Sequence, residues 1–416
     1  MKNASLNNRS VKWATGSACV LYALFSASAT HAQNLTVDSL TGGINTITTA
    51  VPFLMIAPDA RAGGMGDAGA ASTPDPNSLH WNAAKLAFIN KVPFGKKDKS
   101  RNIGFSMSYI PWLRALVPDI NLAYISGYKV LKGNRVSQVV AGSLRYFSLG
   151  DITFTDIVGN VTGQFKPNEF AVDFAYGRSL SENWSGGLAL RYIYSNLTGG
   201  VFVEGNPSHA GRSVAADISA YYQSEVKLFN RDALVAYGIS VTNIGAKISY
   251  TKNADRDFIP INGRMGGAAT FKLDDYNKAM FVADINKLLV PTPPIYNPDG
   301  TIKEGKDPDR SIASGMMGSF YDAPGGLAEE IREFNYSVGG EYWYDNQFAI
   351  RAGYFYEHQT KGNRKFFTVG AGLKYNVFGL DFAYLIPTQQ KHPLENTLRF
   401  TLLFDFAGLG SEGGEE

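Results

Sequence analysis

The pattern that most resembles a cofactor site is the run Gly64-Met65-Gly66-Asp67-Ala68-Gly69. It matches G-x-G-x-x-G, in which glycine amides and the start of a helix bind a dinucleotide pyrophosphate. That fingerprint requires a preceding strand and a long following helix, and Pro74 and Pro76 exclude such a helix. We therefore predict that this run binds no nucleotide cofactor.

Other residues that could support catalysis or metal binding are isolated from one another. Four histidines follow the leader described below, and no spacing places two of them on one face as metal ligands: His80, His209, His358 and His392. The run Asn297-Pro298-Asp299-Gly300 lacks the ligand alternation of a calcium loop and indicates a turn. The sequence therefore predicts no enzyme, no metal and no cofactor, although converging loops could still assemble a Ser-His or Asp-His site.

The N-terminus has the three parts of a secretory signal peptide. Lys2, Arg9 and Lys12 precede an apolar run from about Trp13 to Ala29, and Thr30-His31-Ala32 supplies the small residues before a cut at Gln33. We expect residues 1–32 to be removed, together with the only cysteine, Cys19. An uncleaved anchor and a lipoprotein signal are disfavoured, because the run is short and no aliphatic residue stands three positions before Cys19.

Composition narrows the class of the mature chain. The 416 residues are 44% hydrophobic but only 18% charged, with 26 Phe and 22 Tyr, which favours all-β structure or a membrane surface over a soluble helical enzyme. The mature chain is nearly neutral, since the leader carries three basic residues and no acidic one. This charge argues against nucleic acid as a partner. The chain after the leader has no apolar run long enough for a transmembrane helix.

Strands are the elements that must position any site. Bulky apolar residues alternate with small or charged ones, as in Phe170, Val172, Phe174 and Tyr176 against Glu169, Ala171, Asp173 and Ala175. The alternation predicts about fourteen strands, centred near residues 106, 125, 142, 173, 190, 219, 239, 269, 282, 339, 352, 370, 382 and 402. A soluble β-sandwich or barrel is the competing interpretation. The face opposite the apolar one is too small and glycine-rich for a solvated exterior, and aromatic residues gather at strand ends. We therefore predict an all-β fold, a transmembrane antiparallel β-barrel.

Connection lengths support a barrel in the bacterial outer membrane. The odd-numbered connections are long and the even-numbered ones are short, such as Lys132-Gly133-Asn134-Arg135 and Asp345-Asn346. Outer-membrane barrels have long extracellular loops and short periplasmic turns. An even strand number then predicts that both termini are periplasmic.

The lumen is predicted to hold paired charges. The in-facing charged positions mix both signs, which favours pairing with each other or with a plug over a single-sign ion-selective ring. These positions are Arg145, Asp173, Arg191, Asp217, Glu341, Arg351, Lys374, Asp381, Arg399 and Asp405. Residues 33–100 do not alternate and mix apolar pieces with glycine-rich turns, so we predict a plug there. The barrel is then expected at 101–406, followed by a periplasmic tail, 407–416.

The plug region carries a family resemblance. The run from Ala60 to Gly69, followed by Asp75 and Asn77 and then by the run from Trp81 to Leu86, resembles the N-terminal signature of FadL-type outer-membrane barrels. That family has a fourteen-strand barrel closed by an N-terminal plug. Ala83 departs from the family, which commonly has Pro at this position. The resemblance identifies plug-motif residues: Arg61, Gly64, Gly66, Asp67 and Asn82.

A narrower resemblance is to the PorV family, the barrel component of the type IX secretion system. It rests on the segment from Pro52 to Arg61 and on Tyr109-Ile110-Pro111-Trp112-Leu113. The resemblance implies a carrier that binds the C-terminal signal domain of secreted cargo proteins at the outer face. Its implied partners are outer-membrane lipid, the Sov translocon and a PorU-containing attachment complex that joins cargo to an anionic lipopolysaccharide.

The longest connection, near residues 287–333, is the candidate contact surface for cargo or translocon. It is rich in proline and then in adaptable apolar residues, namely Met316, Met317, Phe320 and Tyr321. A lid folded over the lumen is the alternative role. Two functions therefore remain open, a secretion carrier and a FadL-like transporter of hydrophobic small molecules across the outer membrane.

Overall fold

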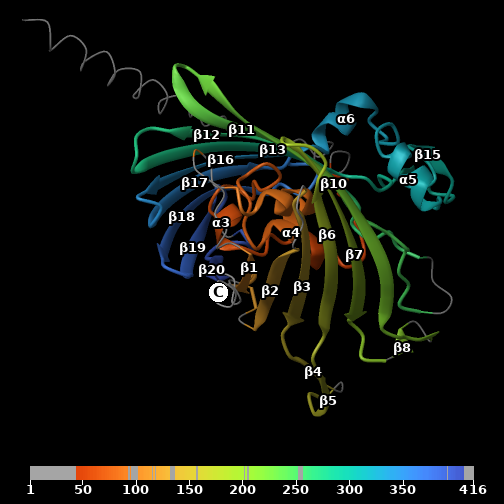
Figure 1. The fold of residues 1–416 in the computed structure, drawn as a ribbon. Coiled ribbons are helices and arrows are strands. Elements are labelled where there is room, and N and C mark those ends of the chain that lie inside the picture. Colours follow the sequence, from red (N-terminus) through yellow and green to blue (C-terminus); the bar gives the residue numbers. More distant parts are fainter. Residues whose placement is uncertain are drawn as a thin grey trace, which may run out of the picture. The chain divides into compact units, whose positions relative to one another are not determined.

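The computed structural model describes residues 44–91, 94, 102–114, 116–117, 119–131, 136–155, 158–200, 202–203, 206–251, 256–390 and 392–406. Its main element is a closed barrel in which fourteen described strands pair antiparallel, and β20 pairs with β1 (Figure 1). The barrel strands are β1 (Ile103–Pro111), β2 (Ile120–Leu131), β3 (Gln138–Leu149), β6 (Asn168–Ser179), β7 (Trp184–Asn196), β10 (Gly211–Leu228), β11 (Arg231–Gly245), β12 (Asn262–Lys272), β13 (Asn277–Leu288), β16 (Asn335–Tyr344), β17 (Phe348–Tyr356), β18 (Lys365–Tyr375), β19 (Phe378–Pro387) and β20 (Leu398–Phe406). Each predicted strand centre falls within one of these strands in turn, and the predicted fold class is confirmed.

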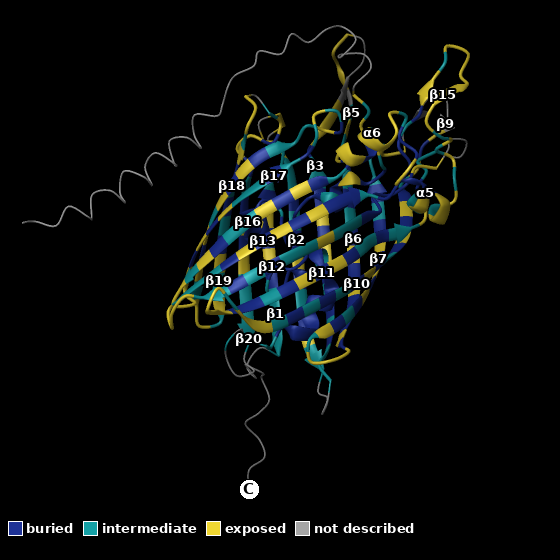
Figure 2. Ribbon diagram, turned by 90° about the horizontal axis from the view of Figure 1, so that it is seen from above, coloured by how far each residue is buried: buried dark blue, intermediate teal, exposed yellow. Residues whose placement is uncertain are grey.

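The barrel wall has an apolar outer face and a buried inner face. In β7, Leu188 and Leu190 are 59% and 67% exposed, while the intervening Ala189 is buried. Figure 2 shows this alternation of exposed and buried residues along many strands. A water-soluble barrel would bury its large apolar side chains, so the exposed rows are typical of a lipid-facing surface.

The connections alternate between long and short, as predicted. The long ones contain the small strand pairs and the two helices of the barrel loops, which are β4 (Ile152–Thr155), β5 (Val161–Phe165), β8 (Phe202–Val203), β9 (Asn206–Pro207), β14 (Ile295–Tyr296), β15 (Ile302–Glu304), α5 (Ile312–Gly318) and α6 (Leu327–Arg332). Figure 2 shows β5, β9, β15, α5 and α6 at one end of the barrel, here called the long-loop end. At the short-turn end, Phe229 and Asn230 join β10 to β11 with φ of 52° and 60°, as a tight hairpin requires. The predicted turn at residues 132–135 lies outside the described residues.

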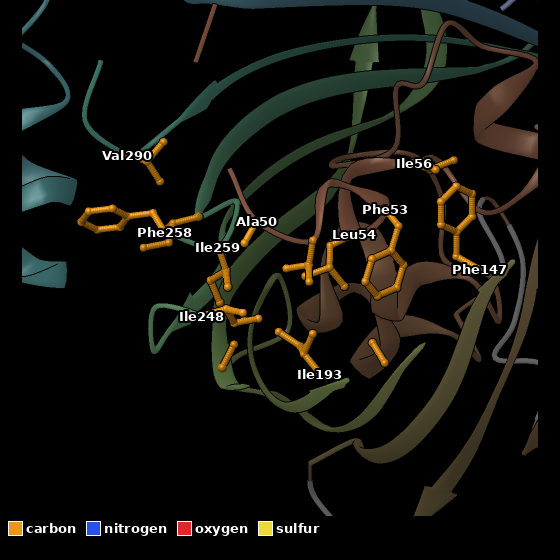
Figure 3. Packing of buried hydrophobic residues seen from close by; sticks show 14 of the residues in the cluster. Ala50, Phe53, Leu54, Ile56, Phe147, Ile193, Ile248, Phe258, Ile259 and Val290 are labelled. Carbon is orange, nitrogen blue, oxygen red and sulfur yellow. The ribbon is translucent and has the colours of Figure 1, made fainter. Parts of the chain in front are cut away.

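The segment before β1 occupies the barrel lumen. It contains η1 (Pro52–Met55), α3 (Ala60–Gly63), α4 (Ser78–Trp81) and η2 (Ala83–Phe88), and Figure 1 shows α3 and α4 enclosed by the strands. We call residues 44–91 the plug. Leu54 and Phe53 of η1 join an apolar cluster with Ile193 of β7 and Phe147 of β3 (Figure 3). The Phe53 and Phe147 rings stack with centroids 6.1 Å apart.

The plug crosses the lumen from one end of the barrel to the other. At the long-loop end, the Asn45 amide donates to the Thr360 carbonyl between β17 and β18. At the short-turn end, Lys91 Nζ donates to the Glu182 carbonyl between β6 and β7. The described chain therefore begins at the end opposite to the one where β20 ends. The N-terminus, which was predicted to be periplasmic, lies outside the described residues. No helix within the described ranges is long and apolar enough to cross a bilayer.

Candidate functional site

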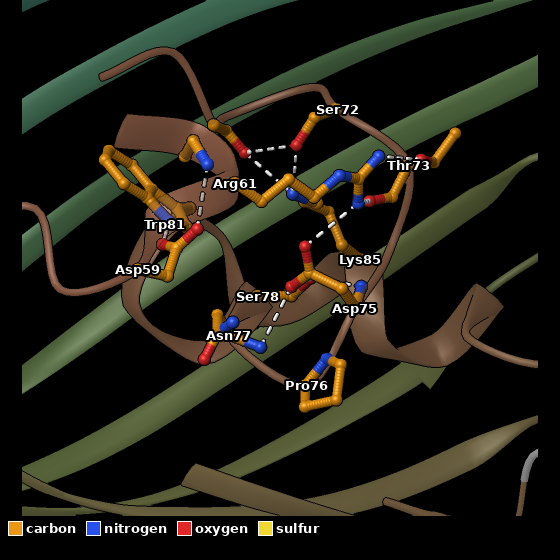
Figure 4. Close-up of polar contacts among 12 residues, drawn as sticks. Asp59, Arg61, Ser72, Thr73, Asp75, Pro76, Asn77, Ser78, Trp81 and Lys85 are labelled. Atoms are coloured by element: carbon orange, nitrogen blue, oxygen red, sulfur yellow. Dashed lines mark hydrogen bonds and ion pairs between the residues drawn. The ribbon is translucent and has the colours of Figure 1, made fainter. Parts of the chain in front are cut away.

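Arg61 of α3 is the centre of the contacts that fasten the plug to the wall. Its Nε and Nη2 donate to the Glu341 carboxylate of β16 at 2.9 and 2.7 Å. Its Nη1 donates to Asp75 Oδ2 at 2.9 Å, and Figure 4 shows this pair within the plug. On the wall, Arg351 of β17 donates to Glu341 and to Asp381 of β19, both at 2.7 Å. Positive and negative groups thus alternate from the plug to β19, and all five residues are mostly shielded from water.

Polar groups inside the plug fix its own conformation. Asp59 caps α3 by accepting from the Ala62 amide at 2.8 Å, and it accepts from Trp81 Nε1 at 2.7 Å (Figure 4). Burial, and then the nearby Asp75 carboxylate, raises the pKa of Asp59 to about 6. Lys85 Nζ donates to the Gly69 carbonyl and to Ser72 Oγ at 2.7 and 2.9 Å. Burial lowers the pKa of Lys85 to about 8.

The glycine run serves close packing against the wall. Gly66 has φ of +70°, and a Cβ there would lie 2.7 Å from the backbone nitrogen and oxygen of Tyr354 in β17. The amides of Gly69 and Ala70 both donate to Asp284 Oδ2 of β13, at 2.7 and 2.8 Å. The amides that could have cradled a phosphate are therefore occupied by a carboxylate of the barrel itself.

A second charged group links the plug to β3, β6, β7 and β10. Arg191 of β7 pairs with Asp173 Oδ1 at 2.5 Å and with Asp217 Oδ2 at 3.2 Å. Arg145 of β3 donates to the Leu54 carbonyl of the plug at 2.6 Å, and its Nη2 lies 2.5 Å from His80 Nδ1. Burial, with the cationic Arg145, Arg264 and Arg191 nearby, lowers the pKa of His80 well below its ordinary value. The imidazole is therefore neutral at physiological pH.

The predicted pairing of the in-facing charges is confirmed for nine of the ten positions. Besides the pairs above, Lys374 lies 3.2 Å from Asp405, and Arg399 lies 2.5 Å from Asp67 of the plug. The tenth position, Arg145, contacts plug carbonyls and His80 instead of a carboxylate.

All five plug-motif residues lie at the interface between plug and wall. Arg61 and Asp67 form ion pairs with Glu341 and Arg399, and Asn82 Nδ2 donates to the Ala220 carbonyl at 3.0 Å. A Cβ on Gly64 would lie 3.3 Å from Arg351 Cβ. Sequence reasoning missed Asp284, although its in-facing position in an alternating strand was a usable signal.

The connection between β13 and β16, residues 289–334, is here called the lid. Its inner side holds Ile312 and Met316 of α5 against the cluster that contains Phe258. Its outer side exposes apolar side chains that are 50 to 75% accessible to solvent, namely Met317, Phe320, Tyr321, Leu327 and Ile331. Of the four predicted contact residues, Met316 thus packs inward and the other three are exposed.

Buried ion pairs hold the base of the lid. Lys287 of β13 pairs with Glu330 at 3.0 Å and with Glu333, while Lys361 pairs with Glu329 and Glu333 at 2.5 and 2.9 Å. The plug takes part in the same cluster, because Asn45 Nδ2 donates to Glu329 Oε1 and to the Pro293 carbonyl, both at 3.0 Å. The lid is therefore attached both to the barrel wall and to the first residues of the plug.

A cavity of about 350 Å³ lies at the short-turn end between the plug and the wall. Plug residues Asp75, Pro76 and Lys91 line one side, and residues of β12 to β20 line the other. Among the described residues, no group of three or more His, Cys, Asp or Glu side chains could hold a metal ion.

Comparison with known proteins gives one family match. The family model described as "Type IX secretion system protein PorV" matches residues 40–295. Among solved structures, the chain is similar to the CymD monoaromatic hydrocarbon channel, with 13% identity, coverage of 87% of this chain and 100% of that chain, and a TM-score of 0.42. It is also similar to a Pseudomonas aeruginosa FadL homologue, with 11% identity, coverage of 87% of this chain and 99% of that chain, and a TM-score of 0.42. The similarity to the Ralstonia pickettii toluene transporter TbuX has 11% identity, coverage of 84% of this chain and 98% of that chain, and a TM-score of 0.40. No curated protein sequence matches this chain.

Proposed function

The chain belongs to the PorV family of type IX secretion system proteins, whose model matches more than half of it, and from this premise we propose that it is an outer-membrane carrier for secreted proteins. The carrier binds the C-terminal signal domain of cargo at the long-loop end. It associates with the Sov translocon and delivers cargo to a PorU-containing attachment complex at the cell surface.

The proposal includes an orientation in the outer membrane. The long loops face the outside of the cell and the short turns face the periplasm, as in outer-membrane barrels generally. Residues 1–32 are a cleaved signal peptide, and the tail after β20 is periplasmic. The plug and the barrel act as a closed support for the lid.

The observation that carries the proposal is the exposed apolar face of the lid. Met317, Phe320 and Tyr321 stay exposed, although Met316 and Ile312 of the same segment are partly buried against the apolar cluster that contains Phe258. The ion pairs at the lid base fasten the segment that carries this face to the barrel. Several exposed apolar side chains within one loop that is fastened by ion pairs favour a protein partner over open solvent.

A photo-cross-linking experiment tests the contact between lid and cargo. A photoreactive amino acid is placed at Met317 or at Phe320 of the purified mature protein, and an isolated cargo signal domain is added. We expect cross-links from both positions. The control position is Tyr276, which is 60% exposed in a short turn at the other end of the barrel. Equal cross-linking from Tyr276 would contradict docking at the lid.

Deletion of the gene separates the two functions that the sequence left open. Loss of a whole class of exported proteins from the medium and cell surface is expected of a secretion carrier. Normal export combined with lost uptake of hydrophobic compounds would instead support the transporter.

The cavity at the short-turn end is the one observation that favours a transporter. Transport would nevertheless require the plug to move. Such a movement would break the buried pairs of Arg61 with Glu341 and of Asp67 with Arg399.

A further inference from the structure

The cavity at the short-turn end combines an apolar wall with basic side chains. Met280 of β13, Leu373 of β18 and Leu403 of β20 supply apolar surface. Lys278 and Lys374 line the same cavity. Such a lining fits an occupant that carries both an apolar group and negative charge.

The carboxylates of the cavity are already engaged by neighbouring cations. Asp75 and Glu341 pair with Arg61, Asp381 pairs with Arg351, and Asp405 pairs with Lys374. By contrast, Lys278 Nζ donates to the amide oxygen of Asn346 at 2.9 Å, not to a carboxylate.

One buried donor of this lining lacks an acceptor. The Nη2 atom of Arg351 is buried without a hydrogen-bond partner among the described residues, and the side chain is 0% exposed. An unpaired buried donor of a charged group is costly, so an acceptor entering the cavity would be stabilised there.

The C-terminal tail of the chain could supply such an acceptor, because it follows a strand that lines the cavity. Leu403 and Asp405 of β20 line the cavity, and β20 ends at Phe406. Residues 407–416, which lie outside the described residues, read Ala-Gly-Leu-Gly-Ser-Glu-Gly-Gly-Glu-Glu. The tail thus carries one large apolar residue followed by three glutamates, with glycines between them. Ten extended residues reach at most about 35 Å.

We propose that this cavity is the docking site of the chain's own acidic tail. Leu409 packs on the apolar wall, and the carboxylates of Glu412, Glu415 and Glu416 meet the basic side chains and the free donor of Arg351. The tether raises the local concentration of the tail, so docking needs little intrinsic affinity.

Disulfide formation between introduced cysteines tests the proposal, since the expected mature chain has no cysteine of its own. The full mature protein carries Ser411→Cys in the tail and Thr270→Cys in the cavity lining, on β12 and therefore not beside β20. In low salt we expect this pair to oxidise about tenfold faster than a control pair, since docking concentrates the tail in the cavity. The control combines Ser411→Cys with Ser181→Cys, in a short turn at the same end of the barrel that does not line the cavity.

Two further arms distinguish docking from random contact. The triple variant Glu412→Gln, Glu415→Gln and Glu416→Gln keeps the tail length and should remove the difference in oxidation rate between the two cysteine pairs. High salt should remove it as well, because it screens the charges. Circular dichroism confirms that each variant is folded. Equal rates for the two cysteine pairs, or a difference that survives in the triple variant, would overturn the proposal. The proposal would also be overturned if the cysteine introduced by Thr270→Cys were protected from oxidation only after a separate acidic peptide is added. That result would favour a periplasmic partner as the occupant of the cavity.

Discussion

The plug and the lid are both held by ion pairs, but they differ in what they leave exposed. The plug places Arg61 and Asp67 against charges of the wall and buries most of its apolar residues. The lid buries Glu330 and Glu333 with Lys287 and Lys361 and exposes apolar side chains. Buried polar groups are usually paired, so the plug contacts explain stability. Exposed apolar groups on an ordered support need another explanation, and this separates a structural region from a candidate contact region.

The largest effect should come from removing the centre of the plug contacts. Arg61→Ala leaves Glu341 and Asp75 buried with one cation fewer, so the free energy of unfolding should fall by about 3–5 kcal/mol. Urea titration of the protein in detergent micelles measures this loss. Lys272→Ala is the control, because its pair with Asp275 is at the surface and surface pairs contribute little. Similar losses in the two variants would mean that the plug is not held by its charges.

A second prediction concerns close packing of the plug. Gly66→Ala introduces a Cβ that overlaps the Tyr354 backbone and also suffers the strain of a positive φ, so we expect a loss of about 3 kcal/mol. Gly300→Ala in the lid has a similar φ of +83° but no atom within 4 Å of its Cβ. It should lose only about 1 kcal/mol, the strain alone. The difference between the two variants isolates the contact between plug and wall in the same titration.

The barrel could be predicted from the sequence because a period of two fixes which side of a strand each residue faces. The alternation alone places Val172 and Phe174 on the apolar outer face and Asp173 on the inner face, and the structure has the first two exposed and Asp173 buried. Turn residues such as Asp345-Asn346 then fixed where neighbouring strands join. Because the in-facing positions carry both positive and negative charges, the sequence also predicted that they form ion pairs.

The partners of those charges could not be predicted from the sequence. Arg61 and Glu341 are 280 residues apart, and their contact depends on how the plug is placed in the closed barrel. The plug has no period that fixes its sidedness, so its path from Asn45 to Lys91 was not predictable either. Met316 and Met317 were grouped as one contact surface, because their opposite directions depend on the short helix α5 and the way it packs.

The stability of the lid should depend on pH through the buried carboxyl group of Asp322. Burial, and then the neighbouring Glu330, raises the pKa of Asp322 from its ordinary 3.8 to about 6. Because the pKa of this carboxyl is higher in the folded lid than in the unfolded chain, its protonation contributes to the stability of the lid. This contribution is fully present below pH 3.8 and is lost as the pH rises through about 6. The side chain in the Asp322→Asn variant stays neutral at every pH, so the variant should keep this contribution above pH 6.

Hydrogen exchange of residues 312–333 measures this effect as the difference between the two proteins at each pH. We expect similar protection near pH 4 and greater protection of the Asp322→Asn lid above pH 6. A difference of equal size at both pH values would contradict the assigned titration. The exchange of η1 in the plug serves as the internal control.

Substitution of the exposed Met317 is expected to have the smallest effect on stability and the largest effect on the binding of cargo. Met317→Ser changes a side chain that is 69% exposed, so the free energy of unfolding should change by less than about 0.5 kcal/mol. Its neighbour Met316 packs against the apolar cluster, and Met316→Ser should cost about 1–2 kcal/mol. If the exposed face contacts cargo, Met317→Ser should weaken binding of a labelled signal domain about tenfold. Fluorescence anisotropy measures that binding. A variant that keeps both its stability and its affinity would show that the outward methionine has no role in docking, and the contact surface would have to lie elsewhere on the lid.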